Sequence, residues 1–206
     1  MKLFQSLRWA SAVALLGLAL SAQADDALFK NVQSRLLDAP VIRGQFTQTR
    51  QLTGVKKPLA STGSFLVDKQ HGVIWKAEKP FPSVLRVTRG EILQKNGDQV
   101  MMKLSADKEP TVKTVSSLLF SLFAGDVPAL GRLFTADGKV DGKNWKMALT
   151  PKDPALAKLI AGIKLEGAGT VEHIELDSAS GDVTRIEMHD VATAQALAPA
   201  EAGSFD

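Results

Sequence analysis

The segment "GSFLVDKQHGVIWKAEKP" at residues 63–80 predicts two short strands joined by a polar turn. Phe65 and Val67 alternate with their neighbours before the turn, and Val73 and Trp75 do so after it. Some of the residues between them are apolar as well, so both faces of this ribbon carry apolar side chains. Such a ribbon needs cover on both faces, from a core, a ligand or a partner protein.

The start of the chain predicts export. Lys2 and Arg8 form a positive region, residues 9–20 form a short apolar run, and "AQA" at 22–24 fits a cleavage site after Ala24. We therefore interpret residues 1–24 as a cleaved signal peptide, and the expected location is the periplasm. An uncleaved membrane anchor is the alternative, but the apolar run is short for a membrane span.

Residues 25–206 are expected to form a single domain. Removing residues 1–24 from the 206 leaves 182 residues, which is enough for one sizeable core. The chain has no Cys, so neither disulfides nor a cysteine nucleophile are available. The remainder has 23 basic and 22 acidic side chains, because Lys2 and Arg8 leave with the signal. No basic stripe is interleaved with aromatic residues, so nucleic acid is not an expected partner. We expect the protein to be a monomer.

Periodicity predicts a mainly β fold with some α structure. An amphipathic helix is expected at 26–37, followed by a meander of nine or ten antiparallel strands. The strands are predicted at 42–50, 61–69, 72–80, 83–90, 91–104 (a hairpin turning at Asn96-Gly97), 144–151, 170–177 and 183–191. A sheet of this size curls or closes. If it curls without closing, the result is an unclosed β-barrel.

Apolar helices interrupt the meander midway. The first is predicted at 116–125, with Ser116 as N-cap and Gly125 as its end, and a second at 126–134 begins at Asp126. The first is apolar nearly all round, so it must be buried or must cover something apolar. These helices can plug the mouth of the barrel as a lid. A short helix is also predicted at 154–162, and residues 137–142 are interpreted as a turn.

Catalytic and metal-binding patterns are weak. His173 and His189 lie on neighbouring predicted strands and could join a carboxylate at a metal, but no tight ligand spacing such as HExxH is present. Glu172 and Glu175 point to opposite faces of one strand, which argues against a glycosidase pair. No serine lies in a GxSxG or SxxK motif. We therefore expect no enzyme activity, no metal and no cofactor.

Several phrases in this order resemble the LolA-like family of periplasmic lipoprotein carriers. They are "GQFTQ" at 44–48, the segment at 63–80, "LTPKD" at 149–153 and "IELDSASGDVTRIEMHD" at 174–190. The resemblance extends from the first helix to about Val191 and is closest to a divergent branch of the family. It implies an unclosed barrel with an apolar concave face and a helical lid.

The chain departs from the family pattern at the first hairpin. The family has an Arg-Pro there whose arginine helps to latch the lid, and the matching positions here are Lys69 and Gln70. A lysine offers a single point charge where arginine offers a planar fork. Lys69 is therefore a candidate for a looser or different latch.

The resemblance also implies residues for a lipid-binding cavity. The concave side is expected to consist of Phe65, Val67, Val73, Trp75, Leu85, Val87, Val100, Met102, Trp145, Met147 and Leu149. The lid is expected to consist of Leu118, Leu119, Leu122 and Phe123. Every one of these residues could equally be ordinary core, since apolar alternation marks core more often than a ligand pocket.

The expected function is a carrier that holds acyl chains and shuttles them from the inner to the outer membrane. Each CH₂ removed from water contributes about 0.8 kcal/mol, so an apolar lid that competes with the cargo would moderate affinity. The cargo would be an acylated lipoprotein, a glycolipid or an aryl-polyene lipid, with an inner-membrane transporter as donor and an outer-membrane acceptor. The alternative is a non-catalytic periplasmic module that docks on an exporter or envelope complex. A hydrolase ranks third.

Overall fold

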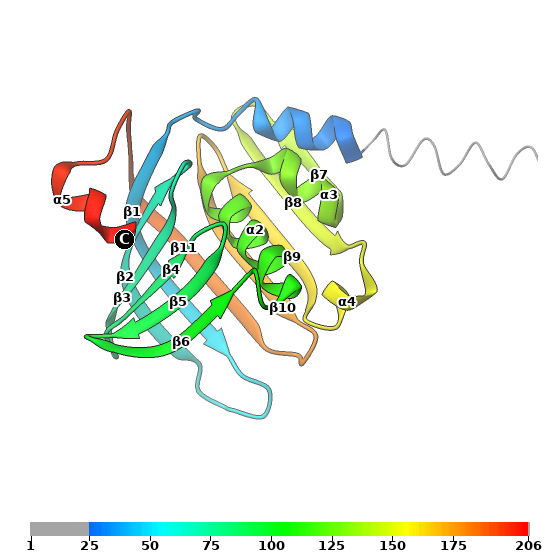
Figure 1. Cartoon of the computed structure of the whole chain (residues 1–206). Coiled ribbons are helices and arrows are strands. Elements are labelled where there is room, and N and C mark those ends of the chain that lie inside the picture. The colour runs from blue at the N-terminus through cyan, green and yellow to red at the C-terminus, as the bar shows by residue number, and fades with distance from the viewer. Residues whose placement is uncertain (1–24, 206) are drawn as a thin grey trace, which may run out of the picture.

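The computed structural model describes residues 25–205, which form one eleven-stranded antiparallel sheet with helices on its concave side (Figure 1). The strands are β1 (Val41–Gln51), β2 (Leu59–Asp68), β3 (Gly72–Lys79), β4 (Ser83–Val87), β5 (Glu91–Asn96), β6 (Gln99–Ser105), β7 (Phe134–Asp141), β8 (Asn144–Pro151), β9 (Ile160–Gly167), β10 (Val171–Ser178) and β11 (Val183–Ala194). The helices are an N-terminal helix (25–33), α2 (Pro110–Ala124), α3 (Val127–Leu133), α4 (Pro154–Ala157), α5 (Pro199–Ala202) and the 3₁₀ turn η1 (Gly203–Phe205).

The strand order explains why the barrel stays open. It runs β6-β5-β4-β3-β2-β1-β11-β10-β9-β8-β7, so two meanders meet where β1 pairs with β11. The free edges are β6 and β7, and the chain between them forms α2 and α3. The helices that cover the concave side are therefore the connection between the two free edges (Figure 1). This confirms the predicted fold, a curved, unclosed antiparallel sheet with mid-chain helices.

One hydrophobic core fills the space between the sheet and these helices. Strand register places alternate residues in rows on the inner face, such as Phe65, Trp75 and Leu85 in one meander and Ile174, Leu165 in the other. The N-terminal helix adds buried side chains to the same cluster. The last two strands contribute Ile174, Leu176, Ile186 and Met188 to this core.

The second apolar face of the hairpin at 63–80 is covered by the end of the chain. Ile74, on the outer face, is only 9% exposed. The segment α5–η1 lies outside β1–β3, on the other side of the sheet from α2 (Figure 1). Arg43 Nη2 is 3.1 Å from Glu201 Oε2, and the rings of His71 and Phe205 are 5.7 Å apart. Both apolar faces of the ribbon are thus covered within this chain.

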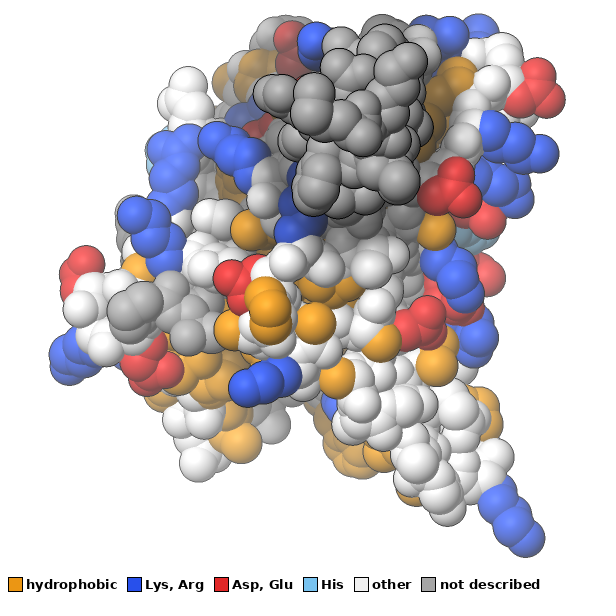
Figure 2. Space-filling view, turned by 90° about the vertical axis from the view of Figure 1, so that its right-hand side faces the viewer, with side chains coloured by type: hydrophobic (Ala, Val, Ile, Leu, Met, Phe, Trp, Pro, Cys, Tyr) orange, Lys and Arg blue, Asp and Glu red, His pale blue; other side chains and the backbone are white. Residues whose placement is uncertain are grey.

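The outer face of the second meander is charged. Glu175 Oε1 lies 2.5 Å from Lys164 Nζ, and Glu175 Oε2 lies 2.6 Å from Arg185 Nε. Lys146 and Glu166 form a further cross-strand pair with an N···O distance of 2.7 Å. Acidic and basic side chains are correspondingly interspersed along the right-hand margin of the space-filling view (Figure 2). The charges of these side chains are thus compensated by cross-strand ion pairs.

Two strands were not predicted from the sequence. Residues 137–142, interpreted as a turn, belong mostly to β7, and only the reversal at Gly142 (φ 58°) is a turn. The helix predicted at 154–162 ends after one turn at Ala157, and β9 begins at Ile160. Ala-rich "PALAKLIAG" favours a helix locally, but the sheet between β8 and β10 requires a strand there.

The start of the first lid helix was also predicted wrongly. α2 begins at Pro110 with Glu109 as N-cap, whereas Ser116 lies in its interior. The turn before Ser116 is rich in Thr and Val, which lowers the local preference for a helix and hides the start. Its predicted end is confirmed, since Gly125 adopts the left-handed conformation with φ 66°.

The signal-peptide interpretation concerns residues 1–24, which lie outside the described residues. Within residues 25–205, none of the helices has both the length and the apolar character needed to cross a membrane.

Candidate functional site

The candidate site is the contact between α2 and the concave face of the sheet. Its centre is an aromatic cluster in which Trp75 stacks on Phe46 with ring centroids 3.8 Å apart. Phe123 of α2 lies 4.8 Å from Trp75, and Phe65 lies 6.1 Å from it on the neighbouring strand. Gly44 leaves room for this arrangement, because a Cβ there would lie 2.8 Å from the Phe65 ring. The helix thus covers the most aromatic part of the sheet.

Most residues expected to line a cavity lie on this concave face. The fully buried ones are Phe65, Val67, Val73, Trp75, Val87, Trp145, Met147 and Leu149. Leu85 and Met102 are partly buried and pack against the same core. These side chains contact the helices and one another, so the expected cavity is filled by the protein itself.

Val100 does not belong to this set. Opposite Gln94 and Lys95 the register of β6 shifts, so that Met102 pairs with Gln94 but Val100 pairs with Lys95. Cross-strand partners share a face, and this bulge moves Val100 to the outer face. Val100 is accordingly 52% exposed. Simple alternation along 99–105 placed it on the wrong side because a bulge leaves no clear mark in the sequence.

The expected lid residues all lie on α2. Leu118, Leu122 and Phe123 are buried, and Leu119 is partly buried against the core. The junction of α2 and α3 is tied to the N-terminal helix, because the Val127 N–H donates to Gln33 Oε1 at 3.1 Å. Asp126 caps α3, as predicted, by accepting from the Ala129 N–H. The lid is therefore held by apolar packing, by this hydrogen bond to the N-terminal helix, and by Lys152, whose Nζ donates to the Gly131 carbonyl of α3 at 2.7 Å.

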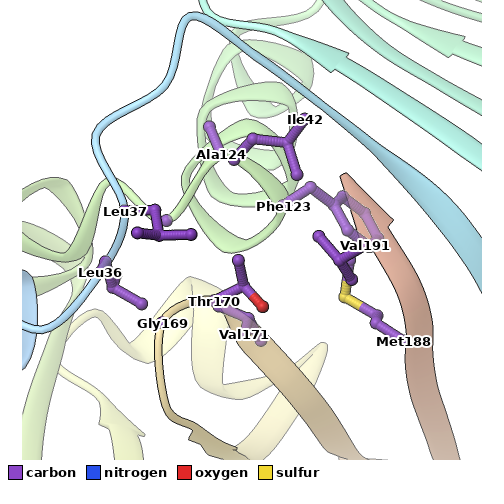
Figure 3. Close-up of a pocket in the computed structure, with 11 residues that line it drawn as sticks. Leu36, Leu37, Ile42, Phe123, Ala124, Gly169, Thr170, Val171, Met188 and Val191 are labelled. Atoms are coloured by element: carbon purple, nitrogen blue, oxygen red, sulfur yellow. The ribbon is translucent and has the colours of Figure 1, made fainter. Parts of the chain in front are cut away.

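An apolar crevice opens where α2 ends. It is lined by the segment after the N-terminal helix, by the end of α2, and by β1, β10 and β11, whose side chains point toward one another (Figure 3). Its lining residues are Leu36, Leu37, Ile42, Phe123, Ala124, Gly125, Gly169, Thr170, Val171, Met188 and Val191. The free volume is about 10 Å³, which is close to the minimum that admits a single water molecule. An acyl chain can enter here only if α2 moves away from the sheet.

Lys69 lies beside the lid but pairs elsewhere. Its Nζ is 2.8 Å from Asp38 Oδ1, and its backbone N–H donates to the Pro40 carbonyl. Asp38 is 96% exposed at its side chain, so this ion pair is weak. Lys69 also borders a hollow together with Gly125 and Asp126 at the end of α2. No ion pair joins Lys69 to α2 or α3 within residues 25–205.

The neighbouring Asp68 is a buried carboxylate at the same turn. Burial opposes its charge, but hydrogen bonds from the backbone N–H groups of His71 and Gln70, and from the His71 ring, outweigh this, and the pKa of Asp68 lies below its usual value. Stability from this group is present above the ordinary Asp pKa of about 4 and is lost as pH falls through the lowered value.

We expect Asp68→Asn to lower the free energy of unfolding at pH 7 and to flatten its decline between about pH 5 and pH 2. Urea unfolding at several pH values measures both effects. Asp98→Asn, in the exposed β5–β6 turn, serves as the control and should follow the unmodified chain. If the free energy of unfolding of the two variants changed with pH in the same way, the hydrogen bonds of Asp68 would contribute nothing to the pH dependence of stability.

Sequence reasoning missed a group of cations around the lid. Arg89, Lys113 and Arg132 border a cleft between α2 and α3 together with three serines of α2. They come from the β4–β5 turn and from both helices, and such a convergence over distant positions leaves no local signal. His173 lies opposite Glu187 on the neighbouring strand. Across the described part of the chain, no cluster of three His, Cys, Asp or Glu could hold a metal ion.

Comparison with known proteins agrees with this architecture. Residues 19–204 match the family model of "Outer membrane lipoprotein carrier protein LolA-like". No curated protein sequence matches the chain. Among solved structures, a DUF1329 family protein from Desulfovibrio piger is similar, with a TM-score of 0.52, 11% identity and coverage of 90% of this chain and 99% of that one.

Two further solved structures are similar in fold. A LolA superfamily protein from Nitrosomonas europaea has a TM-score of 0.48 at 9% identity, covering 86% of this chain and 96% of that one. An outer membrane lipoprotein-sorting protein domain from Vibrio parahaemolyticus has a TM-score of 0.47 at 8% identity, covering 87% and 96%. The family model spans nearly the whole described chain and coincides with an unclosed sheet under a helical lid. The chain therefore belongs to the family of LolA-like outer membrane lipoprotein carrier proteins.

Proposed function

We propose that this protein is a non-catalytic periplasmic carrier that binds the acyl chains of a lipoprotein or a related lipid between α2 and the sheet. The supporting observation is the lid itself. The only connection between the two free edges of the described sheet is a helical segment that lays apolar side chains on an aromatic concave face. When α2 swings outward, that face becomes available to an acyl chain without any loss of backbone pairing in the sheet.

In this proposal the closed form competes with cargo. The leucines of α2 occupy the place of the acyl chain, and binding has to displace them. The net binding free energy is then the difference between burying the acyl chain and burying the leucines of α2. Because these two contributions are similar, the affinity stays moderate and the cargo can pass to an acceptor. The donor would be an inner-membrane transporter and the acceptor an outer-membrane component.

The test is native mass spectrometry of the protein purified from a periplasmic fraction, followed by lipid extraction. We expect a retained acyl-bearing species that a fluorescent fatty-acyl probe displaces, and its mass identifies the cargo class. A bare protein mass together with no probe binding by folded protein would contradict carriage of lipid.

A docking module is the second candidate, and one surface favours it. Phe81 in the β3–β4 turn is 80% exposed, and Val100 and Met101 at the start of β6 are 52% and 58% exposed. Antiparallel pairing brings these positions to the same end of β3–β6. An apolar tip of this kind can contact a membrane or an envelope protein. A protein that binds no lipid but loses a partner on Phe81→Ser would fit this function.

The role of Lys69 can be tested separately. We propose that Lys69 acts as a latch between the first hairpin and the lid, because it lies beside the end of α2. Its ion pair, however, is with Asp38 and not with the lid. We expect Lys69→Met to change the free energy of unfolding by less than about 1 kcal/mol. Acyl-probe titration checks the latch. A severalfold gain in probe affinity would show that Lys69 holds the lid closed, and unchanged affinity would remove it from the mechanism.

A further inference from the structure

We propose that the cleft between α2 and α3 binds a phosphate-like anion, and that this anion is the headgroup of the lipid whose acyl chain lies under α2. The inference rests on the proposed carrier function and adds a class of ligand to it, namely an anionic, phosphate-bearing lipid. It concerns a polar site on the outer side of the lid, separate from the apolar contact between lid and sheet.

The cleft is large enough for a headgroup. It has a volume of about 260 Å³ and is lined by Arg89, Lys113, Ser116, Ser117, Phe120, Ser121, Asp126, Ala129 and Arg132. A second hollow of about 280 Å³ shares Arg89, Phe120 and Asp126 with it and adds Lys69. Both open directly beside the lid, in contrast to the filled space beneath it.

The two hollows connect the cations to the apolar crevice. The second hollow and the crevice of Figure 3 share Ala124 and Gly125, at the end of α2. The cationic hollow and the apolar crevice therefore adjoin each other at the C-terminal end of α2. An amphipathic molecule with an anionic head and an acyl tail matches this order of surfaces.

The charge of the cleft is not balanced. Within residues 25–205, no acidic side chain lies within ion-pair distance of Arg89, Lys113 or Arg132. The one carboxylate that lines the cleft, Asp126, is engaged at Oδ1 by the Ala129 N–H as a helix cap. Arg89 contributes a hydrogen bond of 3.4 Å to the Lys69 carbonyl and lies 6.0 Å from the Phe120 ring centroid, which leaves most of its donors available.

This imbalance is local. On the outer face of the second meander, Lys146, Lys164 and Arg185 each pair with a carboxylate on a neighbouring strand. Three unpaired cations around one concavity create a positive potential that a phosphate can neutralise through several charge-assisted hydrogen bonds.

Ser116 provides an independent indication. Its side chain is 1% exposed, it lines the cleft, and its Oγ has no hydrogen-bond partner among the described residues. A serine inside a helix commonly donates to the carbonyl four residues earlier, which would satisfy the hydroxyl. A buried hydroxyl left without a partner is unfavourable, and an anion in the cleft would accept from it. The same helical face carries Lys113 one turn earlier.

The test compares two lipids that differ only by a phosphate. The mature protein is titrated by calorimetry with 1-palmitoyl-lysophosphatidic acid and with 1-monopalmitoylglycerol, both below their aggregation concentrations, and with inorganic phosphate. We expect the lysophosphatidic acid to bind at least about tenfold more tightly than the uncharged lipid, because hydrogen bonds to charged groups contribute this much.

Variants of the cleft residues test whether the preference for the phosphate-bearing lipid arises in the cleft. Arg89→Gln combined with Lys113→Gln should abolish it, and Ser116→Ala should reduce it about threefold through loss of one donor. The matched control is Lys95→Gln combined with Lys139→Gln, which removes the same charge from exposed outer positions and should leave the preference unchanged. If the double variant folds poorly, Lys113→Gln alone gives the same comparison.

The outcomes separate this proposal from the carrier function. Equal affinity for the two lipids would overturn the headgroup site and leave the carrier intact. Binding of neither lipid would reject the carrier and the headgroup site with it. Binding of inorganic phosphate that depends on Arg89 and Lys113, with equal affinity for the two lipids, would show a site for free phosphate and likewise overturn the headgroup assignment.

Discussion

Leu122→Asp is expected to abolish binding of a fluorescent fatty-acyl probe and to lower the free energy of unfolding by roughly 3 kcal/mol or more. Leu122 is 3% exposed and belongs to the core cluster between α2 and the sheet. In the closed form the introduced carboxylate would be buried without a partner. In a loaded form it would face the acyl chain, so neither arrangement of the lid tolerates it.

The measurement pairs probe titration with urea unfolding. Leu59→Asp makes the same chemical change at the start of β2, where the leucine is 56% exposed, and should leave both quantities nearly unchanged. If Leu122→Asp does not fold, Leu122→Ala, with an expected loss of about 2–5 kcal/mol, still reports on the lid. Undiminished probe binding by folded Leu122→Asp protein would place the acyl site elsewhere.

Gly63→Ala is expected to destabilise the fold by roughly 2–4 kcal/mol although it adds a single methyl group. A Cβ at Gly63 would lie 1.9 Å from the Lys76 carbonyl oxygen and 3.0 Å from the Ala77 Cα. These are backbone atoms of the paired strand β3, which cannot move without opening the β2–β3 ladder that carries Phe65 and Trp75.

The control for this prediction is Gly90→Ala in the β4–β5 turn, where a Cβ would have no other atom within 4 Å. Urea unfolding should give a reduced midpoint for Gly63→Ala with an unchanged slope, and a midpoint for Gly90→Ala close to that of the unmodified chain. Equal midpoints for the two variants would mean that β2 and β3 can separate locally at no measurable cost.

The sequence was most informative where one face of a strand alternates cleanly. Trp145, Met147 and Leu149 alternate cleanly with small or polar residues in β8, whereas both faces of β2 and β3 are apolar, and there the family resemblance implied that Phe65 and Trp75 face the concave side. It was least informative where the sheet overrides local preference. β9 contains the alternating pair Ile163 and Leu165, but the alanines before it suggested a helix that continues.

Parts of the site depend on features that no local pattern encodes. The bulge that moves Val100 outward is a property of the β5–β6 register. β7 is an edge strand in which Ala136 and Gly138 separate Phe134 from Val140 on the inner side, so its hydrophobic alternation is weak. The cationic cleft forms only because the fold brings Arg89 of the β4–β5 turn close to Arg132 of α3. Family resemblance implied the lid, but only the folded chain reveals this convergence.

The pairing of β1 with β11 has a consequence for how the chain folds. Every other strand pair in the sheet joins consecutive strands, which close short loops quickly, whereas Phe46 and Met188 are partners far apart in the chain. We therefore expect the two meanders to form early and independently, and their union at β1–β11 to be the late, slow event. Until that union, the inner faces of both meanders are exposed to water. A chaperone that binds the unassembled meanders would have to cover these faces through that interval.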